Sequence, residues 1–169
     1  MGLPYLTDDK DPMTEQYYAT LGDAYYKTND FKKSFETYDK ALILNPKNAY
    51  VLNNYSYYLS IRDSKLEFAE KLSKITINAE PDNSTYLDTY AWILYKLERY
   101  QDALFYIKKA YEYGGYQNAV IVDHYGDILL KTKNIKEAIK MWELSKKMGN
   151  TDSELTNKIE LYKQTQHEE

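Results

Sequence analysis

Hydrophobic residues recur along this chain at spacings of three and four, in pairs of segments separated by short polar breaks. Such spacing places apolar side chains on one face of an α-helix. Residues 28–30 (Thr-Asn-Asp) interrupt the first pair and Asn45-Pro46 ends it, so residues 15–48 are predicted to form a helical hairpin. The apolar positions of this hairpin are Tyr18, Leu21, Tyr25, Phe31, Phe35, Tyr38, Ala41 and Leu42.

The hairpin pattern returns with a period of 34 or 35 residues, because Gly22, Ser56, Ala91 and Gly126 fall in register. Self-similarity at this period is the mark of a repeat array. We predict an array over residues 14–150, with hairpins at about 15–48, 49–83, 84–118 and 119–150. A flexible lead-in (1–13), a capping helix (151–165) and a disordered tail (166–169) complete the prediction. Thr151 and Glu154 have the spacing of a capping box at the start of the last helix.

Small residues occupy two positions of every hairpin, which indicates a close approach of its two helices. The first position is held by Gly22 and its equivalents, and the second by Ser34, Ala69, Ala103 and Ala138. One hairpin has too little apolar surface to fold alone, so stability must come from stacking each hairpin on the next. A bulky side chain at Gly22 or Ala138 is expected to overpack the helix crossing.

The pattern resembles the tetratricopeptide repeat (TPR). In the first hairpin the family's positions read Tyr18, Leu21, Gly22, Tyr25, Ser34, Tyr38, Ala41 and Pro46. The resemblance implies an all-α fold, a right-handed superhelical solenoid of four TPR hairpins with a C-terminal capping helix. It also implies a binding scaffold, in which the first helix of each hairpin lines a concave face. The family serves many unrelated tasks, so the resemblance does not name a partner.

The helical register predicts which side chains face the concave groove. Tyr26, Tyr57, Trp92 and Tyr95 form an aromatic row, and Asp23, Asp88, Asp123 and Asp127 form an acidic track beside it. Tyr and Trp favour interfaces, so we expect a groove for an extended or helical peptide, preferably one with basic residues. Asn53 and Asn54 complete the predicted site. The alternative is that these aromatic residues are packing or chance, since the chain holds 20 tyrosines.

Some TPR domains clamp a terminal carboxylate with Lys, Arg and Asn at defined positions of the first helices. The matching positions here are Ala19, Asp23, Asn54, Thr85 and Thr89, of which only Asn54 fits. An acidic track would also repel a carboxylate. A chaperone co-factor of that kind is therefore not expected.

Composition and sequence motifs limit the functional classes to which the chain could belong. The chain has no cysteine and a net charge of −4, which argues against thiolate metal sites and against nucleic acid as a partner. No apolar run is long enough to span a bilayer, so direct membrane insertion is not expected. Asp123 and Asp127 alone are a poor cation site, and His124 has no nucleophile or phosphate loop beside it in sequence. We predict no enzyme activity, no catalytic residue, no metal and no cofactor.

Two further hypotheses remain open. The aromatic surface could form a homodimer or dock on another domain of the same polypeptide. Residues 53–110 also resemble the C-terminal repeats of long bacterial cell-envelope TPR proteins involved in assembly or secretion. If the chain is a fragment of such a protein, the bacterial periplasm or envelope is favoured over the cytoplasm.

Overall fold

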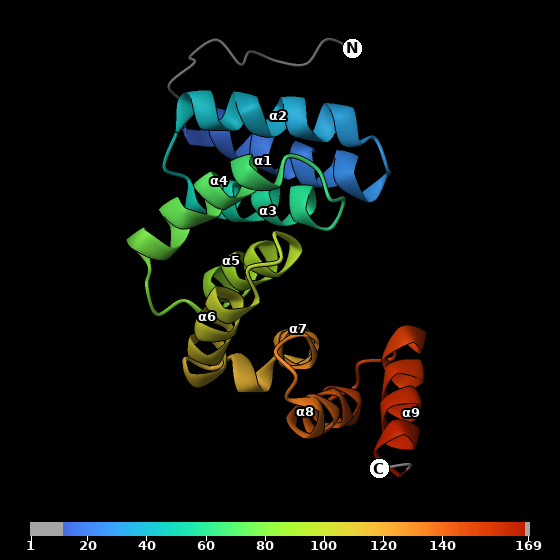
Figure 1. Ribbon diagram of the computed structural model, residues 1–169. Coiled ribbons are helices and arrows are strands. Elements are labelled where there is room, and N and C mark those ends of the chain that lie inside the picture. Colours follow the sequence, from blue (N-terminus) through green and yellow to red (C-terminus); the bar gives the residue numbers. More distant parts are fainter. Residues whose placement is uncertain (1–11, 168–169) are drawn as a thin grey trace.

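The computed structural model describes residues 12–167, which contain helices joined by short turns (Figure 1). Within this part of the chain there are nine α-helices and one 3₁₀ turn, and no strand. Their bounds are α1 (Pro12–Lys27), α2 (Phe31–Leu44), α3 (Ala49–Ser60), α4 (Leu66–Ala79), α5 (Ser84–Lys96), α6 (Tyr100–Glu112), η1 (Gly115–Gln117), α7 (Ala119–Lys131), α8 (Ile135–Lys147) and α9 (Ser153–His167).

The helices pack as consecutive antiparallel pairs, α1 with α2, α3 with α4, α5 with α6 and α7 with α8. Each pair then packs on the next, and α9 packs on α8 at the end of the array. In Figure 1 the first helix of each pair lies on the inner side of the curve and the second helix on the outer side. The predicted all-α solenoid of four hairpins and a terminal helix is confirmed.

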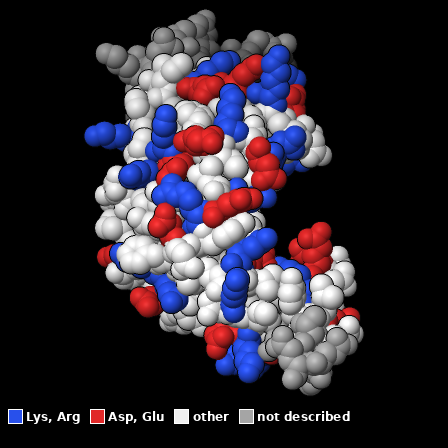
Figure 2. Space-filling view, in the orientation of Figure 1, with Lys and Arg blue, Asp and Glu red and all other residues white. Residues whose placement is uncertain are grey.

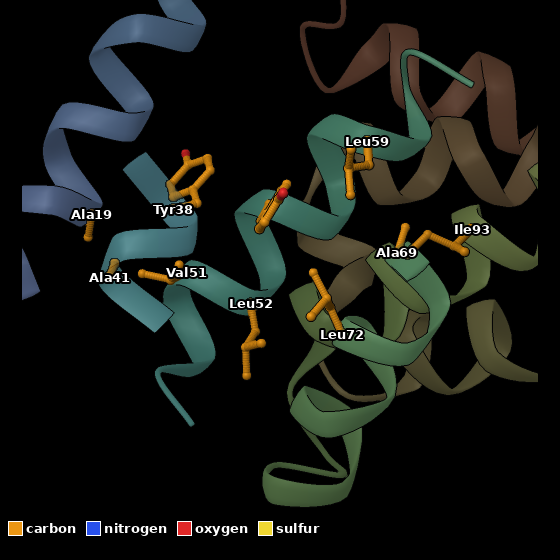
Figure 3. Packing of buried hydrophobic residues seen from close by; sticks show 10 residues of the cluster. Ala19, Tyr38, Ala41, Val51, Leu52, Leu59, Ala69, Leu72 and Ile93 are labelled. Atoms are coloured by element: carbon orange, nitrogen blue, oxygen red, sulfur yellow. The ribbon is translucent and has the colours of Figure 1, made fainter. Parts of the chain in front are cut away.

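Buried residues form three clusters along the array, as expected when every hairpin contacts only its neighbours. Figure 3 shows the first cluster, in which Val51, Leu52 and Leu59 of α3 lie between side chains of α2 and α4. Ile93 of α5 belongs to the same cluster, so the second and third hairpins share one continuous apolar contact. The clusters are the reason that neighbouring first helices are held at a fixed spacing on the concave side.

Two glycines allow the close helix crossings predicted from the sequence. A Cβ atom on Gly22 would lie 2.6 Å from the ring of Tyr38, and one on Gly126 would lie 2.4 Å from the ring of Trp142. Both aromatic residues are completely buried. In both hairpins, a large ring from the second helix therefore fills the space that the glycine leaves on the first helix.

The ends of the array differ from the predicted boundaries. Helix α1 begins at Pro12, inside the predicted lead-in, and residues 1–11 and 168–169 lie outside the described part of the chain. Helix α9 begins at Ser153 and continues to His167, two residues beyond the predicted end of the capping helix. The predicted Thr151 cap is wrong, because the backbone N–H of Glu154 donates to the side chain of Asp152 at 2.9 Å. Asp152 has the preferred geometry of an N-cap, one residue before the helix.

Candidate partner-binding site on the concave face

A cavity of about 310 Å³ opens on the concave side, where α3, α5 and α7 meet. Its volume lies at the small end of the range of about 300–1,000 Å³ for ligand pockets, which suits a short segment of chain rather than a large ligand. Figure 2 shows the outline of the molecule hollowed between the first hairpins and the end that carries α9. The cavity is lined by Asn53, Asn54, Tyr57, Tyr58, Thr85, Asp88, Thr89, Asn118, Val120 and Ile121.

Four of the ten predicted site residues line this cavity, namely Asn53, Asn54, Tyr57 and Asp88. The other six (Asp23, Tyr26, Trp92, Tyr95, Asp123 and Asp127) do not. The remaining lining residues are Tyr58 of α3, Thr85 and Thr89 of α5, and Asn118, Val120 and Ile121 at the start of α7. Sequence reasoning considered Thr85 and Thr89 only as clamp-equivalent positions and missed the other four. Asn118 could have been found as the N-cap residue of α7, because its side chain accepts from the N–H of Val120 at 2.9 Å.

The predicted aromatic row is divided into two separate stacks. Tyr26 stacks on Tyr58 with ring centroids 3.6 Å apart, across the first and second hairpins. Trp92 is enclosed by Tyr95 at 4.7 Å and His124 at 4.0 Å, with nearly parallel rings. These rings already contact one another, so most of the row contributes to packing between hairpins. Of the four predicted aromatic residues, only Tyr57 faces the cavity.

The carboxylate of Asp23 is held by donors of the chain itself. The hydroxyl groups of Tyr38 and Tyr50 both donate to it, and the side-chain amide of Asn54 donates at 3.2 Å. Burial, followed by the bond to Asp23, raises the pKa of Tyr38, so this phenol stays protonated and remains a donor. Asp23 thus joins the first hairpin to the second.

Asp123 and Asp127 are paired with Lys158 of α9. The Lys158 ammonium lies 2.9 Å from Asp123 and 2.6 Å from Asp127, and it also lies above the ring of Trp142 at 5.1 Å. Burial alone would lower the pKa of Lys158, but the two carboxylates outweigh burial and raise it. The indole N–H of Trp142 donates to Asp127 at 2.9 Å. The last helix therefore supplies the cation that this part of the acidic track attracts.

Asp88 and His124 form a buried pair between α5 and α7. The Nδ1 atom of His124 lies 2.9 Å from the Asp88 carboxylate, and the two residues are 8% and 6% exposed. Burial lowers the pKa of His124, but Asp88, then Asp127 and Asp123, raise it by more, and the pKa is raised overall. The sequence gives no sign of this partner for His124, because Asp88 is 36 residues away.

All four aspartates of the acidic track are thus engaged within the chain, and the cavity holds only Asp88 among them. Ala19, one of the positions that match the carboxylate clamp, is completely buried in the first core cluster. Asn53 lines the cavity but is only 7% exposed, and its buried side-chain oxygen accepts no hydrogen bond. The concave site is therefore a cavity lined by amide, hydroxyl and apolar groups. The acidic track does not form an exposed row of negative charge.

Residues 12–167 lack the features of a metal site and of a membrane span. No group of three or more His, Asp or Glu side chains in this range has the arrangement of a metal site. Among the same residues, no helix is both long and apolar enough to cross a membrane. On the face drawn in Figure 2, positive and negative side chains are interspersed rather than gathered by sign.

Several solved structures share this fold. Among solved structures, the PilF protein of Pseudomonas aeruginosa is similar at a TM-score of 0.80 and 17% identity, over 92% of this chain and 70% of that one. MamA of Desulfovibrio magneticus RS-1 gives 0.68 and 14%, over 82% and 77%. YrrB, described as a TPR protein with an unusual peptide-binding site, gives 0.64 and 17%, over 89% and 76%.

The comparison with curated proteins gave no match. The family model described as tetratricopeptide repeat matches residues 6–148, which is most of the chain and includes all four hairpins. Its extent agrees with the repeat period and with the stacked helix pairs. The chain therefore belongs to the tetratricopeptide repeat family.

Proposed function

We propose that this protein is an interaction scaffold that binds a segment of a partner protein on its concave face, anchored in the cavity between α3, α5 and α7. The observation that carries the proposal is the cavity itself, which combines the ring of Tyr57, the apolar side chains of Val120 and Ile121, and several amide and hydroxyl groups. Mixed linings of this kind hold a ligand by apolar burial and orient it by a few polar contacts.

Family membership supports this proposal at a general level, because the TPR is a protein-interaction fold, typically without enzyme activity. The similarity to YrrB, whose description names a peptide-binding site, points in the same direction. The internal pairing of the four aspartates changes one part of the original hypothesis. A requirement for basic residues in the partner loses its main support, since those carboxylates already have donors.

A peptide-library selection on the immobilised protein, followed by calorimetry on the selected peptides, tests the proposal. Val120 lines the cavity yet is 49% exposed, so Val120→Arg should block the cavity without disturbing the core. Ile43→Arg is the matched control, because Ile43 is 78% exposed at the end of α2, away from the cavity. We expect Val120→Arg to weaken binding about tenfold or more, as loss of an anchor does, and Ile43→Arg to leave it unchanged.

Tyr57→Ala provides a second variant at the same site, with Tyr116→Ala as its control because Tyr116 is 49% exposed and outside the cavity. Thermal unfolding measured by circular dichroism verifies that each variant is folded. Peptides that bind both cavity variants as tightly as the wild type would place the binding site elsewhere and refute the proposal.

Self-association is the second candidate, and one observation favours it. Both ends of the array carry exposed apolar side chains, Met13 (75%) and Ile43 (78%) at the first hairpin and Leu161 (56%) on α9. Such ends could stack on each other. Light scattering over a range of concentrations tests self-association. End-to-end association predicts an average mass that rises with protein concentration in the wild type and rises less in Ile43→Arg. A constant monomer mass rules it out.

A further inference from the structure

The first hairpin leaves uncovered a face that the other three hairpins bury. The first helix of every hairpin carries three large side chains at matching positions, which in α1 are Tyr18, Leu21 and Tyr25. All three are partly exposed, whereas their equivalents in the later hairpins are buried, apart from the partly buried Tyr125. The equivalents are Leu52, Tyr55 and Leu59 in α3, Leu87, Tyr90 and Leu94 in α5, and Val122, Tyr125 and Leu129 in α7.

In the later hairpins this face is covered by the second helix of the hairpin before. The ring of Tyr55 stacks on Phe35 and Tyr38 of α2, with centroids 5.3 and 5.5 Å apart. Helix α4 packs on α5, and the ring of Tyr125 packs against Tyr111 of α6 at 5.5 Å. The chain thus shows three times which kind of element covers this face, namely an amphipathic helix with the stripe of a second helix.

On the first hairpin the uncovered face forms a groove, which we call the outer groove. Two adjoining cavities of about 200 and 240 Å³ share Tyr18 and Lys40 in their walls. Leu21 and Tyr25 line the first cavity, and Ile43 lines the second. Every residue that lines them belongs to α1 or α2, the helix pair at one end of the array (Figure 1).

The other end of the array is covered within the chain. The second helix α8 is covered by α9, whose Leu155, Ile159 and Tyr162 pack in one cluster with Trp142. The exposed side of α9 is mostly polar, as the end of a repeat array requires. Within residues 12–167, each second helix (α2, α4, α6 and α8) is therefore already covered by the helix that follows it. A second copy of this chain has no uncovered second helix to offer to the outer groove.

The residue types of the outer groove indicate an occupant that binds reversibly. The equivalents of Tyr18 and Tyr25 are aliphatic and buried in every later hairpin. A tyrosine has an apolar ring and a hydroxyl that water can reach, so it suits a face that is alternately wet and covered. The ammonium groups of Lys40 and Lys33 lie above these two rings, 5.8 and 5.4 Å from the centroids. Such a face is typical of a contact with a separate partner rather than of permanent stacking.

We infer that the outer groove docks an amphipathic helix of a partner protein, which takes the place that a preceding second helix would occupy. This helix presents large apolar residues at the spacing of Phe35, Tyr38 and Leu42, with a small residue at the position of Ala41. The outer groove is separate from the concave cavity, so the inference goes beyond the proposed function. Together the two sites give the scaffold one place for a partner on its concave face and one at its end.

A helical peptide with the sequence of residues 30–47, which contain α2, tests the inference. A lactam bridge between two solvent-facing positions holds it as a helix, because an isolated helix of this length is marginal in water. A second peptide has the same composition and bridge, with its apolar residues moved off the stripe. Each is titrated into the full ¹⁵N-labelled chain, and the backbone signals of Tyr18, Leu21 and Tyr25 are followed by NMR. We expect the first peptide to bind at least about tenfold more tightly than the second.

Ile43→Arg places a charge in the outer groove at a position that is 78% exposed, so the fold should tolerate it. We expect this variant to bind the α2 peptide about tenfold more weakly than the wild type. Leu161→Arg is the matched control at the other end of the array, where Leu161 is 56% exposed, and should leave binding unchanged. Equal binding of the two peptides, no shift with either, or full binding by Ile43→Arg overturns the inference.

Other occupants of the outer groove are outcomes of the same experiments. If the α2 peptide binds only after residues 1–11 are removed, that segment and not a partner helix fills the groove. A mass that doubles with concentration in the wild type but not in Ile43→Arg would assign the groove to a second copy. Either result overturns the inference.

The variants also separate this inference from the proposed function. If library-selected peptides depend on Val120 while the α2 peptide does not bind, the concave cavity is a binding site and the outer groove is not. If the α2 peptide depends on Ile43 while no selected peptide depends on Val120, the outer groove is a binding site and the proposed function fails.

Discussion

His124 lies 2.9 Å from Asp88 and stacks on Trp92, so one buried imidazole joins the third and fourth hairpins by both charge and ring contact. Asp88 also forms part of the cavity wall. The protonation of His124 therefore bears on how firmly α5 and α7 are held together at the proposed site. This relationship leads to the first prediction.

The pairing of His124 predicts a pH-dependent stability. The pKa of His124 is raised above its ordinary value of 6.5 in the folded protein, so the pair contributes fully below the unfolded-state pKa. That contribution is lost as the pH rises through the folded-state pKa. The free energy of unfolding of the wild type and of His124→Gln is measured with urea at each pH. We expect the difference, wild type minus variant, to fall as the pH rises above about 6.5.

His124→Gln also lacks the ring contact with Trp92, which changes the free energy of unfolding by the same amount at every pH. Only the slope of the difference against pH therefore reports the pairing of His124 with Asp88. Asp88→Asn serves as the control, because without the Asp88 carboxylate only the weaker attraction of Asp127 and Asp123 opposes burial. The slope should therefore become shallower or reverse. A wild-type advantage that grows with pH would contradict the assignment.

Gly126→Ala should destabilise the protein although alanine is the better helix former. The added Cβ would lie 2.4 Å from Cδ1 and Nε1 of Trp142, a ring that is completely buried and has no room to move. We expect a loss of about 1–3 kcal/mol in the free energy of unfolding, the usual effect of overpacking.

A smaller ring tests the cause of that loss. In a Trp142→Phe background the same substitution should be neutral or stabilising, since the clash is relieved and the helix propensity of alanine remains, worth about 1 kcal/mol. Gly126→Ala with unchanged or raised stability in the wild-type background would show that the crossing is looser than the structure has it.

Lys158 is expected to hold the last helix in place. Lys158→Met keeps the aliphatic stem above Trp142 but leaves Asp123 and Asp127 facing each other without a cation. The pair is partly buried, so the loss should be on the order of 1–3 kcal/mol, between the values for exposed and buried ion pairs. Amide hydrogen exchange in α9 should become faster.

Lys163→Met is the matched control on the same helix, because the ion pair of Lys163 with Glu143 is about half exposed on both sides and should contribute little. Equal effects of the two substitutions would mean that the position of Lys158 between the carboxylates is unimportant.

Asp23 of α1 is predicted to couple the two helices of the first hairpin through Tyr38 of α2. Asp23→Ala leaves the hydroxyl of this buried tyrosine without its acceptor, which should reduce stability by about 1–3 kcal/mol. A double-mutant cycle with Tyr38→Phe isolates the interaction, since Asp23→Ala should cost less once the hydroxyl is gone. Strictly additive effects of the two substitutions would exclude the coupling.

Much of the fold could be predicted from the sequence, because the same pattern of small and large residues recurs in every hairpin. The small residue at Gly22 and Gly126 and the large ring at Tyr38 and Trp142 recur at one spacing, and the structure pairs them directly. Helix ends were less certain, as the shift of the last cap from Thr151 to Asp152 shows. Thr151 and Asp152 are adjacent and both are residue types that cap helices, so only the backbone geometry shows which of them caps α9.

The sequence by itself determined the period, the helical hairpins and the concave face, because these depend on local spacing of apolar and small residues along one chain. Only the tertiary structure decided which polar groups of that face are free. Asp88 and His124, or Asp123 and Lys158, lie about one repeat apart in sequence, and stacking alone brings them into contact. That same stacking leaves Asn53 without a donor at one seam, a fact that follows from distances between helices and not from the spacing of residues within them.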